Sequence, residues 1–229
     1  MGCRPPANKP GKPQVAGDHQ AGKKQTPPLQ TAFRTEILYP ISDRGEPAVP
    51  RLFTGFEIPT DIAERLDLLR GGLARARWID RDNYHMTLRF IGDVDMVAAE
   101  AVAEGLSRVR REPFSLRITG VGALGTRRPH TVVATIETSA SLMELQAEHE
   151  RIIQRIGLPP EGRKYTPHVT LARVRNGHAR DIADYLSLRG GFTTGPFAVD
   201  RFVLFSSRET VGGGPYVIEE AYDLDRVAA

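Results

Sequence analysis

The four-residue pattern H-x-T-L occurs twice in the chain, as HMTL at residues 85–88 and as HVTL at residues 168–171. Side chains two residues apart on a β-strand point to the same face, so each copy places an imidazole beside a hydroxyl group. Two such strands facing each other would surround one small anion with two proton carriers and two hydrogen-bond donors. The repeat therefore predicts a fold with two related halves and a cleft between them.

Each copy of the pattern is followed by the same signals, a glycine-containing turn and then a helix. Hydrophobic periodicity predicts helices at about 61–69, 96–109, 139–156 and 179–188, and strands at 52–56, 84–90, 114–119, 131–137, 168–174, 197–206 and 216–224. The fold class that follows is α+β, with two pseudo-symmetric lobes of antiparallel-rich sheet, helices outside and a central cleft. Strict alternation places Phe90 on the face opposite His85, and Ser141 with Glu144 resembles a capping box.

Composition separates the chain into two parts. Residues 1–50 hold nine of the 17 prolines without apolar periodicity, so we expect a disordered basic extension there. Residues 51–229 form the expected bilobal domain. The net charge of +3 lies in the extension, because the domain has equal numbers of acidic and basic residues. Anion recognition by the domain must therefore be local rather than a broad basic field.

The chain's only cysteine, Cys3, fits a reducing compartment such as the cytoplasm. No run of about 18 apolar residues occurs, so we expect no membrane span.

The paired motifs indicate acid–base chemistry. Histidine titrates near pH 6.5, so one imidazole can accept a proton while another donates one, and each transfer contributes roughly 10²–10⁴-fold. The hydroxyls of Thr87 and Thr170 can donate hydrogen bonds to non-bridging phosphoryl oxygens. No cysteine–histidine cluster has zinc spacing, and no carboxylate stands beside both motifs. His85 and His168 therefore predict cleavage of a phosphodiester without a metal or another cofactor.

One competing motif fails on its context. Residues 120–125 read GVGALG and match the dinucleotide fingerprint G-x-G-x-x-G. That fingerprint requires the third glycine to open a helix, whereas residues 131–137 are predicted to form a strand. We therefore expect these glycines to form a bend between two strands.

Three segments resemble one known family: RLFTGFEIP at residues 51–59, YHMTLRFIG at 84–92 and TPHVTLAR at 166–173. The family is the two-histidine (2H) phosphoesterase superfamily, and the resemblance is closest to RNA 2′,3′-cyclic phosphodiesterases, formerly called 2′-5′ RNA ligases. It implies metal-independent hydrolysis of an RNA 2′,3′-cyclic phosphate to a 2′-phosphomonoester. It also implies that His85 donates a proton to the leaving 3′-oxygen and that His168 activates water, although the residues alone fit either assignment.

Three cations are candidate substrate contacts. By alternation, Arg89 shares a face with the first histidine. Arg173 should face away from His168, yet the resemblance implies a substrate contact at this position, which would require a bulge or the strand's end to reorient it. Lys164 is the only lysine of the domain and lies four residues before His168. For each of the three, an ordinary solvated charge is the alternative.

Two further functions fit the same residues. One is a cyclic or 2′-5′ phosphodiesterase that acts on small nucleotides, and the other is an RNA-end binding protein without turnover. In each case the expected partners are RNA ends or nucleotide cyclic phosphates, bound by a monomer.

Overall fold

The computed structural model describes residues 1–2, 51–125, 129–207 and 216–225. The chain divides into two units, 1–36 and 37–229, and the helices and strands below belong to the second. The predicted extension at residues 1–50 therefore falls almost entirely outside the described residues. Among the helices of the described part, none is both long and apolar enough to cross a lipid bilayer.

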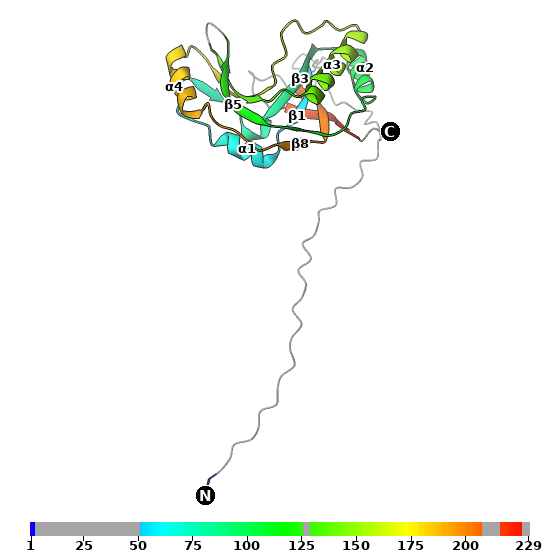
Figure 1. The fold of residues 1–229 in the computed structure, drawn as a ribbon. Helices are drawn as coiled ribbons and strands as arrows, with labels where there is room; N and C mark the ends of the chain where they lie inside the picture. Colours follow the sequence, from blue (N-terminus) through cyan, green and yellow to red (C-terminus); the bar gives the residue numbers. More distant parts are fainter. Residues whose placement is uncertain (3–50, 126–128, 208–215, 226–229) are drawn as a thin grey trace, which may run out of the picture. The chain divides into compact units, whose positions relative to one another are not determined.

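An antiparallel sheet of eight strands forms the centre of the second unit (Figure 1). Its order is β10-β9-β1-β3-β7-β6-β5, and β2 also pairs with β7. The strands are β1 (Arg51–Glu57), β2 (Ala76–Trp78), β3 (His85–Asp93), β5 (Ile118–Leu124), β6 (Thr131–Ile136), β7 (His168–Val174), β9 (Arg201–Ser207) and β10 (Tyr216–Asp223). A separate small sheet pairs β4 (Phe114–Leu116) with β8 (Phe197–Val199). The predicted antiparallel-rich sheet is confirmed.

The large sheet consists of two halves that meet at a narrow seam. Strands β1 and β3 pair along seven positions and β6 and β7 along five, but β3 and β7 pair only at Met86 and Val169. Both of these side chains are fully buried. One half is therefore β10-β9-β1-β3 and the other is β7-β6-β5 with β2, as the repeated motif predicts.

The helices repeat the same order in both halves. They are α1 (Thr60–Asp67), α2 (Met96–Leu106), α3 (Ala140–Arg155) and α4 (Ala179–Arg189), with a short 3₁₀ helix η1 (Arg81–Asn83) before β3. The succession β1-α1-β3-α2 corresponds to β6-α3-β7-α4. Each half thus presents a motif strand that is preceded and followed by a helix.

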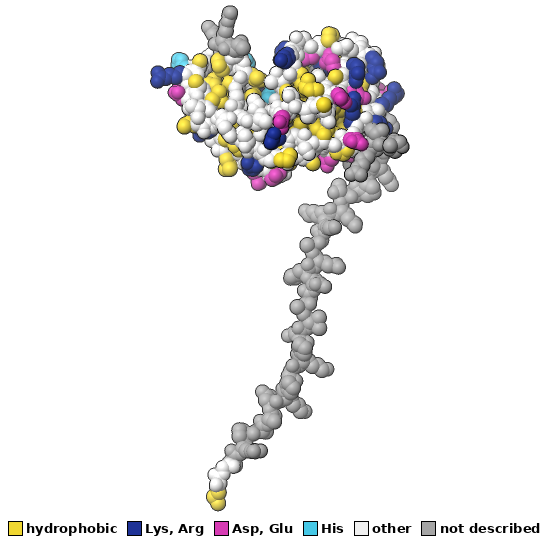
Figure 2. All heavy atoms as spheres, viewed as in Figure 1, with side chains coloured by type: hydrophobic (Ala, Val, Ile, Leu, Met, Phe, Trp, Pro, Cys, Tyr) yellow, Lys and Arg dark blue, Asp and Glu magenta, His cyan; other side chains and the backbone are white. Residues whose placement is uncertain are grey.

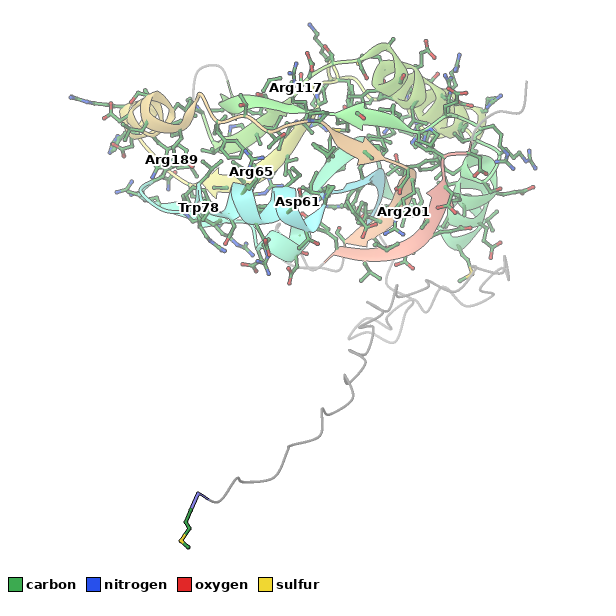
Figure 3. All side chains as sticks on the ribbon, turned by 60° about the horizontal axis from the view of Figure 1, so that its bottom comes forward. Asp61, Arg65, Trp78, Arg117, Arg189 and Arg201 are labelled. Atoms are coloured by element: carbon green, nitrogen blue, oxygen red, sulfur yellow. The ribbon has the colours of Figure 1, made fainter. Side chains whose placement is uncertain are left out.

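The helix before each motif strand crosses to the other half of the molecule. Helix α3 packs with α2, and α1 packs towards α4. The hydroxyl of Tyr185 in α4 donates to the Leu69 carbonyl just after α1 at 2.7 Å, and Arg65 of α1 donates to the Thr193 carbonyl at 2.9 Å. Figure 3 labels Arg65 and Arg189 on these two helices. This exchange of helices ties the two halves together beyond the narrow seam.

Two local expectations are wrong. The helix α3 is capped by Ser139, whose hydroxyl accepts from the Leu142 amide at 3.2 Å, and not by Ser141. Residues 120–124 do not form a bend but continue strand β5, which is irregular next to Gly120. The strand β2 was not predicted, because three residues are too few to show a period.

On the face of the sheet that α3 covers, the α3 residue His149 is fully buried. Its Nδ1 lies 2.9 Å from the Thr54 hydroxyl on β1, and its ring meets Phe202 of β9 edge to face at 4.6 Å. Burial lowers the pKa of His149 to about 3. The ring is therefore a neutral core residue at physiological pH.

This burial makes stability depend on pH. In the unfolded chain His149 takes up a proton near pH 6.5, whereas in the folded protein it does so only near pH 3. The unfolded state therefore binds more protons between these values, and the free energy of unfolding falls as the pH drops. The contribution at pH 5 is about 2 kcal/mol relative to pH 7. Urea unfolding at pH 7 and pH 5 should show that the free energy of unfolding falls less in His149→Gln than in wild type. The control variant His178→Gln, at an exposed histidine, should behave like wild type.

Candidate active site

The two H-x-T-L motifs lie side by side on antiparallel strands. Because Met86 pairs with Val169, the neighbouring positions place His85 opposite Thr170 and Thr87 opposite His168. These four side chains are half-buried and share the face opposite the buried pair. Figure 2 shows the molecule hollowed between its two halves, with a histidine side chain at the bottom of the hollow. The structure thus brings together the four residues predicted from the motifs.

Both motif histidines are held by the same backbone contact. Nδ1 of His85 lies 2.8 Å from the carbonyl oxygen of Asn83, and Nδ1 of His168 lies 2.7 Å from that of Thr166. A carbonyl oxygen only accepts, so each Nδ1 carries the hydrogen and each Nε2 is the remaining proton-exchanging atom. The two rings therefore have matched tautomers.

A β-bulge in β7 brings Arg173 to the face of the motif. Strand β6 pairs Val132 with Ala172 but Val133 with Thr170, so Leu171 is an extra residue in β7. Leu171 and Ala172 are both buried, and the alternation resumes one residue later with Arg173 exposed. The simple alternation that turned Arg173 away is wrong, and the bulge is the reason.

The first motif contains the same bulge at the same position. Strand β1 pairs Thr54 with Arg89 but Gly55 with Thr87, which leaves Leu88 as the extra residue in β3. Gly55 is required here because a Cβ at this position would collide with the carbonyl oxygen of Met86. After the bulge, Phe90 rather than Arg89 lies on the face of the motif, and it is 46% exposed. Both expectations, Arg89 on that face and Phe90 opposite it, are corrected.

Arg89 is instead a buried structural residue. Its guanidinium pairs with the Glu150 carboxylate of α3 and donates to the carbonyl of Phe90 and, at 2.5 Å, to that of Pro159. It is only 6% exposed. These contacts join the bulge of the first motif to α3 and to the segment that leads into the second motif. Arg89 is therefore not available to a substrate in the cleft.

Comparison with known proteins agrees with this geometry. Residues 58–210 match the family model described as the 2′-5′ RNA ligase superfamily. The RNA 2′,3′-cyclic phosphodiesterase of Aeropyrum pernix is 36% identical over 130 residues, which are 54% of this chain and 73% of the relative. The one of Thermotoga maritima is 31% identical over 165 residues, 71% of this chain and 87% of the relative.

The chain belongs to the 2′-5′ RNA ligase superfamily. Its fold is similar to that of E. coli LigT in the crystal structure with 3′-AMP, with a TM-score of 0.64 at 23% identity over 78% of this chain and 99% of LigT. The predicted 2H phosphoesterase fold is thereby confirmed.

Electrostatics distinguish the first histidine of this superfamily member. Burial lowers the pKa of His85 to about 4; the hydrogen bond to Asn83 opposes this, and the charges of His168 and Arg173 add to it. His85 is therefore neutral in the free protein at pH 7. The lowering of the His85 pKa by Arg173 agrees with a bulge in β7 that turns the guanidinium towards the face of the motifs.

Aromatic side chains surround His85, and the sequence did not assign them to the site. The ring of His85 lies 5.0 Å from Phe53, 5.6 Å from Phe205 and 4.6 Å from Tyr216, between centroids. They come from β1, β9 and β10, which are far apart in the sequence. Only the pairing between these strands identifies them, and a single sequence does not reveal that register.

The remaining candidate, Lys164, is exposed in the segment between α3 and β7. Next to it, the hydroxyl of Tyr165 donates to the carbonyl of Thr87 at 3.3 Å, so this segment lies against the first motif strand. A substrate contact by Lys164 stays a prediction. Among the described residues of this superfamily member, no group of three or more His, Cys, Asp or Glu side chains could hold a metal ion.

Proposed function

We propose that the chain hydrolyses RNA 2′,3′-cyclic phosphate ends to 2′-phosphomonoesters, without a metal, and that His85 and His168 carry the protons. Membership of the superfamily and the curated relatives make the chain a phosphodiesterase. The observation that carries the finer proposal is the matched pair of imidazoles. Each is fixed through Nδ1 to a backbone carbonyl on adjacent antiparallel strands, and this orientation leaves both Nε2 atoms for a substrate between them.

The proposed reaction is an in-line displacement at phosphorus. Nε2 of His168 accepts a proton from water, the water oxygen bonds to phosphorus, and the bond to the 3′-oxygen breaks. Nε2 of His85 gives its proton to that leaving oxygen, so the product is a 2′-phosphomonoester with a free 3′-hydroxyl. The hydroxyls of Thr87 and Thr170 donate to the non-bridging oxygens, and Arg173 offsets their negative charge.

His85 must gain its proton before it can donate one, because it is neutral in the free protein. A bound phosphate anion favours the charged imidazolium, so substrate binding itself raises the proton affinity of the ring. We therefore expect the His85 ring to be neutral in the free site and charged when the substrate is bound.

This cycle can be followed by NMR. We expect the His85 ring to titrate near pH 4 in the free protein and at a higher pH when adenosine 2′-monophosphate is bound. Arg173→Ala should raise the free value, because a nearby positive charge is removed. Assignment of the signal is checked by its loss in His85→Asn. A ring that keeps the same pKa with and without the nucleotide would contradict the proposed donor role.

The proposed function is tested with an oligonucleotide that ends in a 2′,3′-cyclic phosphate, in the presence of EDTA. We expect conversion to the 2′-phosphate, identified by its resistance to enzymes that need a free 2′-hydroxyl. A strict requirement for added metal would reject the mechanism. Turnover of nucleoside cyclic phosphates but not of oligonucleotides would favour a small-nucleotide enzyme, and tight binding without product would favour an RNA-end binding protein.

We further propose that the protein works as a cytoplasmic monomer. Both motifs lie in one chain, so the site is complete without a second copy. A single cysteine suits a reducing compartment. Sedimentation at enzyme-assay concentrations should give the mass of one chain, 25.3 kDa.

A further inference from the structure

A second arginine, Arg77, lies opposite Arg173 on the face of the sheet that carries the motifs. Strand β2 pairs Arg77 with Arg173 of β7, and directly paired residues of an antiparallel ladder share a face. The next side chain, Trp78, points to the opposite face, because its ring lies 5.9 Å from that of Tyr185 in α4. Figure 3 labels Trp78 near Arg189 of the same helix. The exposed Arg77 therefore belongs to the face of the motifs.

Strand β2 continues the line of β3 along the edge of β7. Strand β7 pairs with β3 at Val169 and with β2 at residues 172–174. Because the bulge in β7 takes up one residue, Thr170 and Arg173 are about two strand steps apart, roughly 7 Å. Arg77 lies level with Arg173, so it stands beyond the motif residues by a length that one nucleotide can span.

Backbone hydrogen bonds hold Arg77 from both sides. The Ile79 amide donates to the Leu171 carbonyl at 2.9 Å, and the Arg175 amide donates to the Arg75 carbonyl at 3.3 Å. The contact between the two segments thus extends one residue beyond β2 at each end. The backbone of Arg77 is therefore in place before a ligand arrives, which lowers the ordering cost of binding.

The strands of the two halves differ in charge. Those of the second half, β2, β5, β6 and β7, contain Arg77 and Arg173 and no aspartate or glutamate, a net charge of +2. Those of the first half, β1, β3, β9 and β10, contain three arginines and five carboxylates, a net charge of −2. An anionic chain that leaves the motifs is therefore drawn over the second half. The carboxylates are Glu57, Asp93, Glu219, Glu220 and Asp223.

Arg77 lies farther from the first catalytic histidine than Arg173 does. The charges of His168 and Arg173 lower the pKa of His85, and the charge of Arg77 is not among the causes. The guanidinium of Arg77 therefore stands past the place where the phosphorus bond is cleaved, and it is suited to a different anionic group of the substrate.

We propose that Arg77 binds the phosphodiester group that joins the cyclic-phosphate nucleotide to its 5′ neighbour. The inference rests on the proposed function and narrows its substrate to an RNA end of at least two nucleotides, in preference to a mononucleotide. Arg173 faces the cyclic phosphate, and Arg77 faces the phosphate that a mononucleotide lacks. Contacts to backbone phosphates carry no sequence information, so this contact selects for chain length and not for a base.

The test uses two dinucleotides that end in a 2′-phosphate and differ only in the group between the nucleosides. One has the natural phosphodiester, and the other has a methylphosphonate, which is uncharged. Calorimetry should show wild type binding the charged dinucleotide about 5- to 10-fold more tightly at about 50 mM salt, the electrostatic contribution of one phosphate contact to a single strand. The difference should fall to about threefold at about 200 mM salt.

Variants assign this difference to Arg77. Arg77→Gln should bring the two affinities together at both salt concentrations, whereas Arg77→Lys keeps the charge and should retain part of the difference. The matched control is Arg108→Gln, which removes an exposed arginine just past α2 and should preserve the wild-type difference. Arg77→Met repeats the test if Arg77→Gln does not fold. Equal binding of both dinucleotides by wild type, or an unchanged difference without the Arg77 charge, would overturn the proposal.

These binding measurements need no turnover and so separate this proposal from the proposed function. If no cyclic phosphate is hydrolysed but the difference is found and then lost in Arg77→Gln, the function fails and the phosphodiester site holds. If RNA ends are hydrolysed but binding does not depend on the charge between the nucleosides, the site fails alone.

Discussion

Replacing either motif histidine with asparagine should lower kcat on cyclic-phosphate-ended RNA by about 10²–10⁴-fold. Asparagine retains a polar side chain but cannot exchange a proton, so the loss reports the missing acid or base. His85 and His168 are half-buried at the cleft and not part of the central core. Thermal unfolding of His85→Asn and His168→Asn should therefore stay within a few degrees of wild type.

The matched control is His178→Asn, at an exposed histidine that directly precedes α4. It should keep the wild-type kcat. A His85 or His168 variant that retains more than about a tenth of wild-type kcat would remove that residue from the chemistry, because one positioned proton transfer alone contributes more.

The second large effect concerns folding rather than chemistry. Arg89→Met should lower the free energy of unfolding by about 3–5 kcal/mol, because it leaves the Glu150 carboxylate without its cation in a largely buried site. It also removes the donors to the carbonyls of Phe90 and Pro159. Urea unfolding followed by circular dichroism measures the loss.

The double variant Arg89→Met/Glu150→Met provides the control. With both charges removed, no uncompensated carboxylate is left, and much of the lost stability should return. As a second comparison, Arg108→Met removes an exposed i,i+4 pair with Glu104 and should cost less than about 1 kcal/mol. If Arg89→Met is no less stable than Arg108→Met, the buried pair does not hold the bulge of the first motif.

The sequence predicted the site well where the evidence was local. A histidine and a threonine two residues apart on one strand share a face whatever the rest of the chain does, so His85 with Thr87 and His168 with Thr170 were identified from their spacing alone. The helices and most strands also followed from local periodicity. The repeated order of strand, turn and helix was sufficient to predict two halves.

The predictions that were wrong concerned positions where the strand periodicity is interrupted. The extra residues Leu88 and Leu171 reverse the alternation, and so Arg89 became buried while Arg173 entered the cleft. A strand with a bulge is indistinguishable from a regular strand in a single sequence, except that two adjacent residues have to be buried. Leucine followed by alanine fits that requirement in β7, but leucine followed by arginine does not suggest it in β3. The aromatic side chains around His85 depended on pairing between distant strands and had no local signal.

The shared tautomer of the two histidines bears on which of them acts as the acid and which as the base. Two rings anchored through the same atom to equivalent backbone oxygens are interchangeable as far as their own bonding is concerned. One histidine must act as the acid and the other as the base, so the difference between them must come from other side chains around the site. The equivalent bulges supply such a difference, because one strand presents a phenylalanine and the other a guanidinium as the fifth residue after its histidine. The two sides of the nearly symmetric cleft are therefore chemically different, because Phe90 lies on one side and Arg173 on the other.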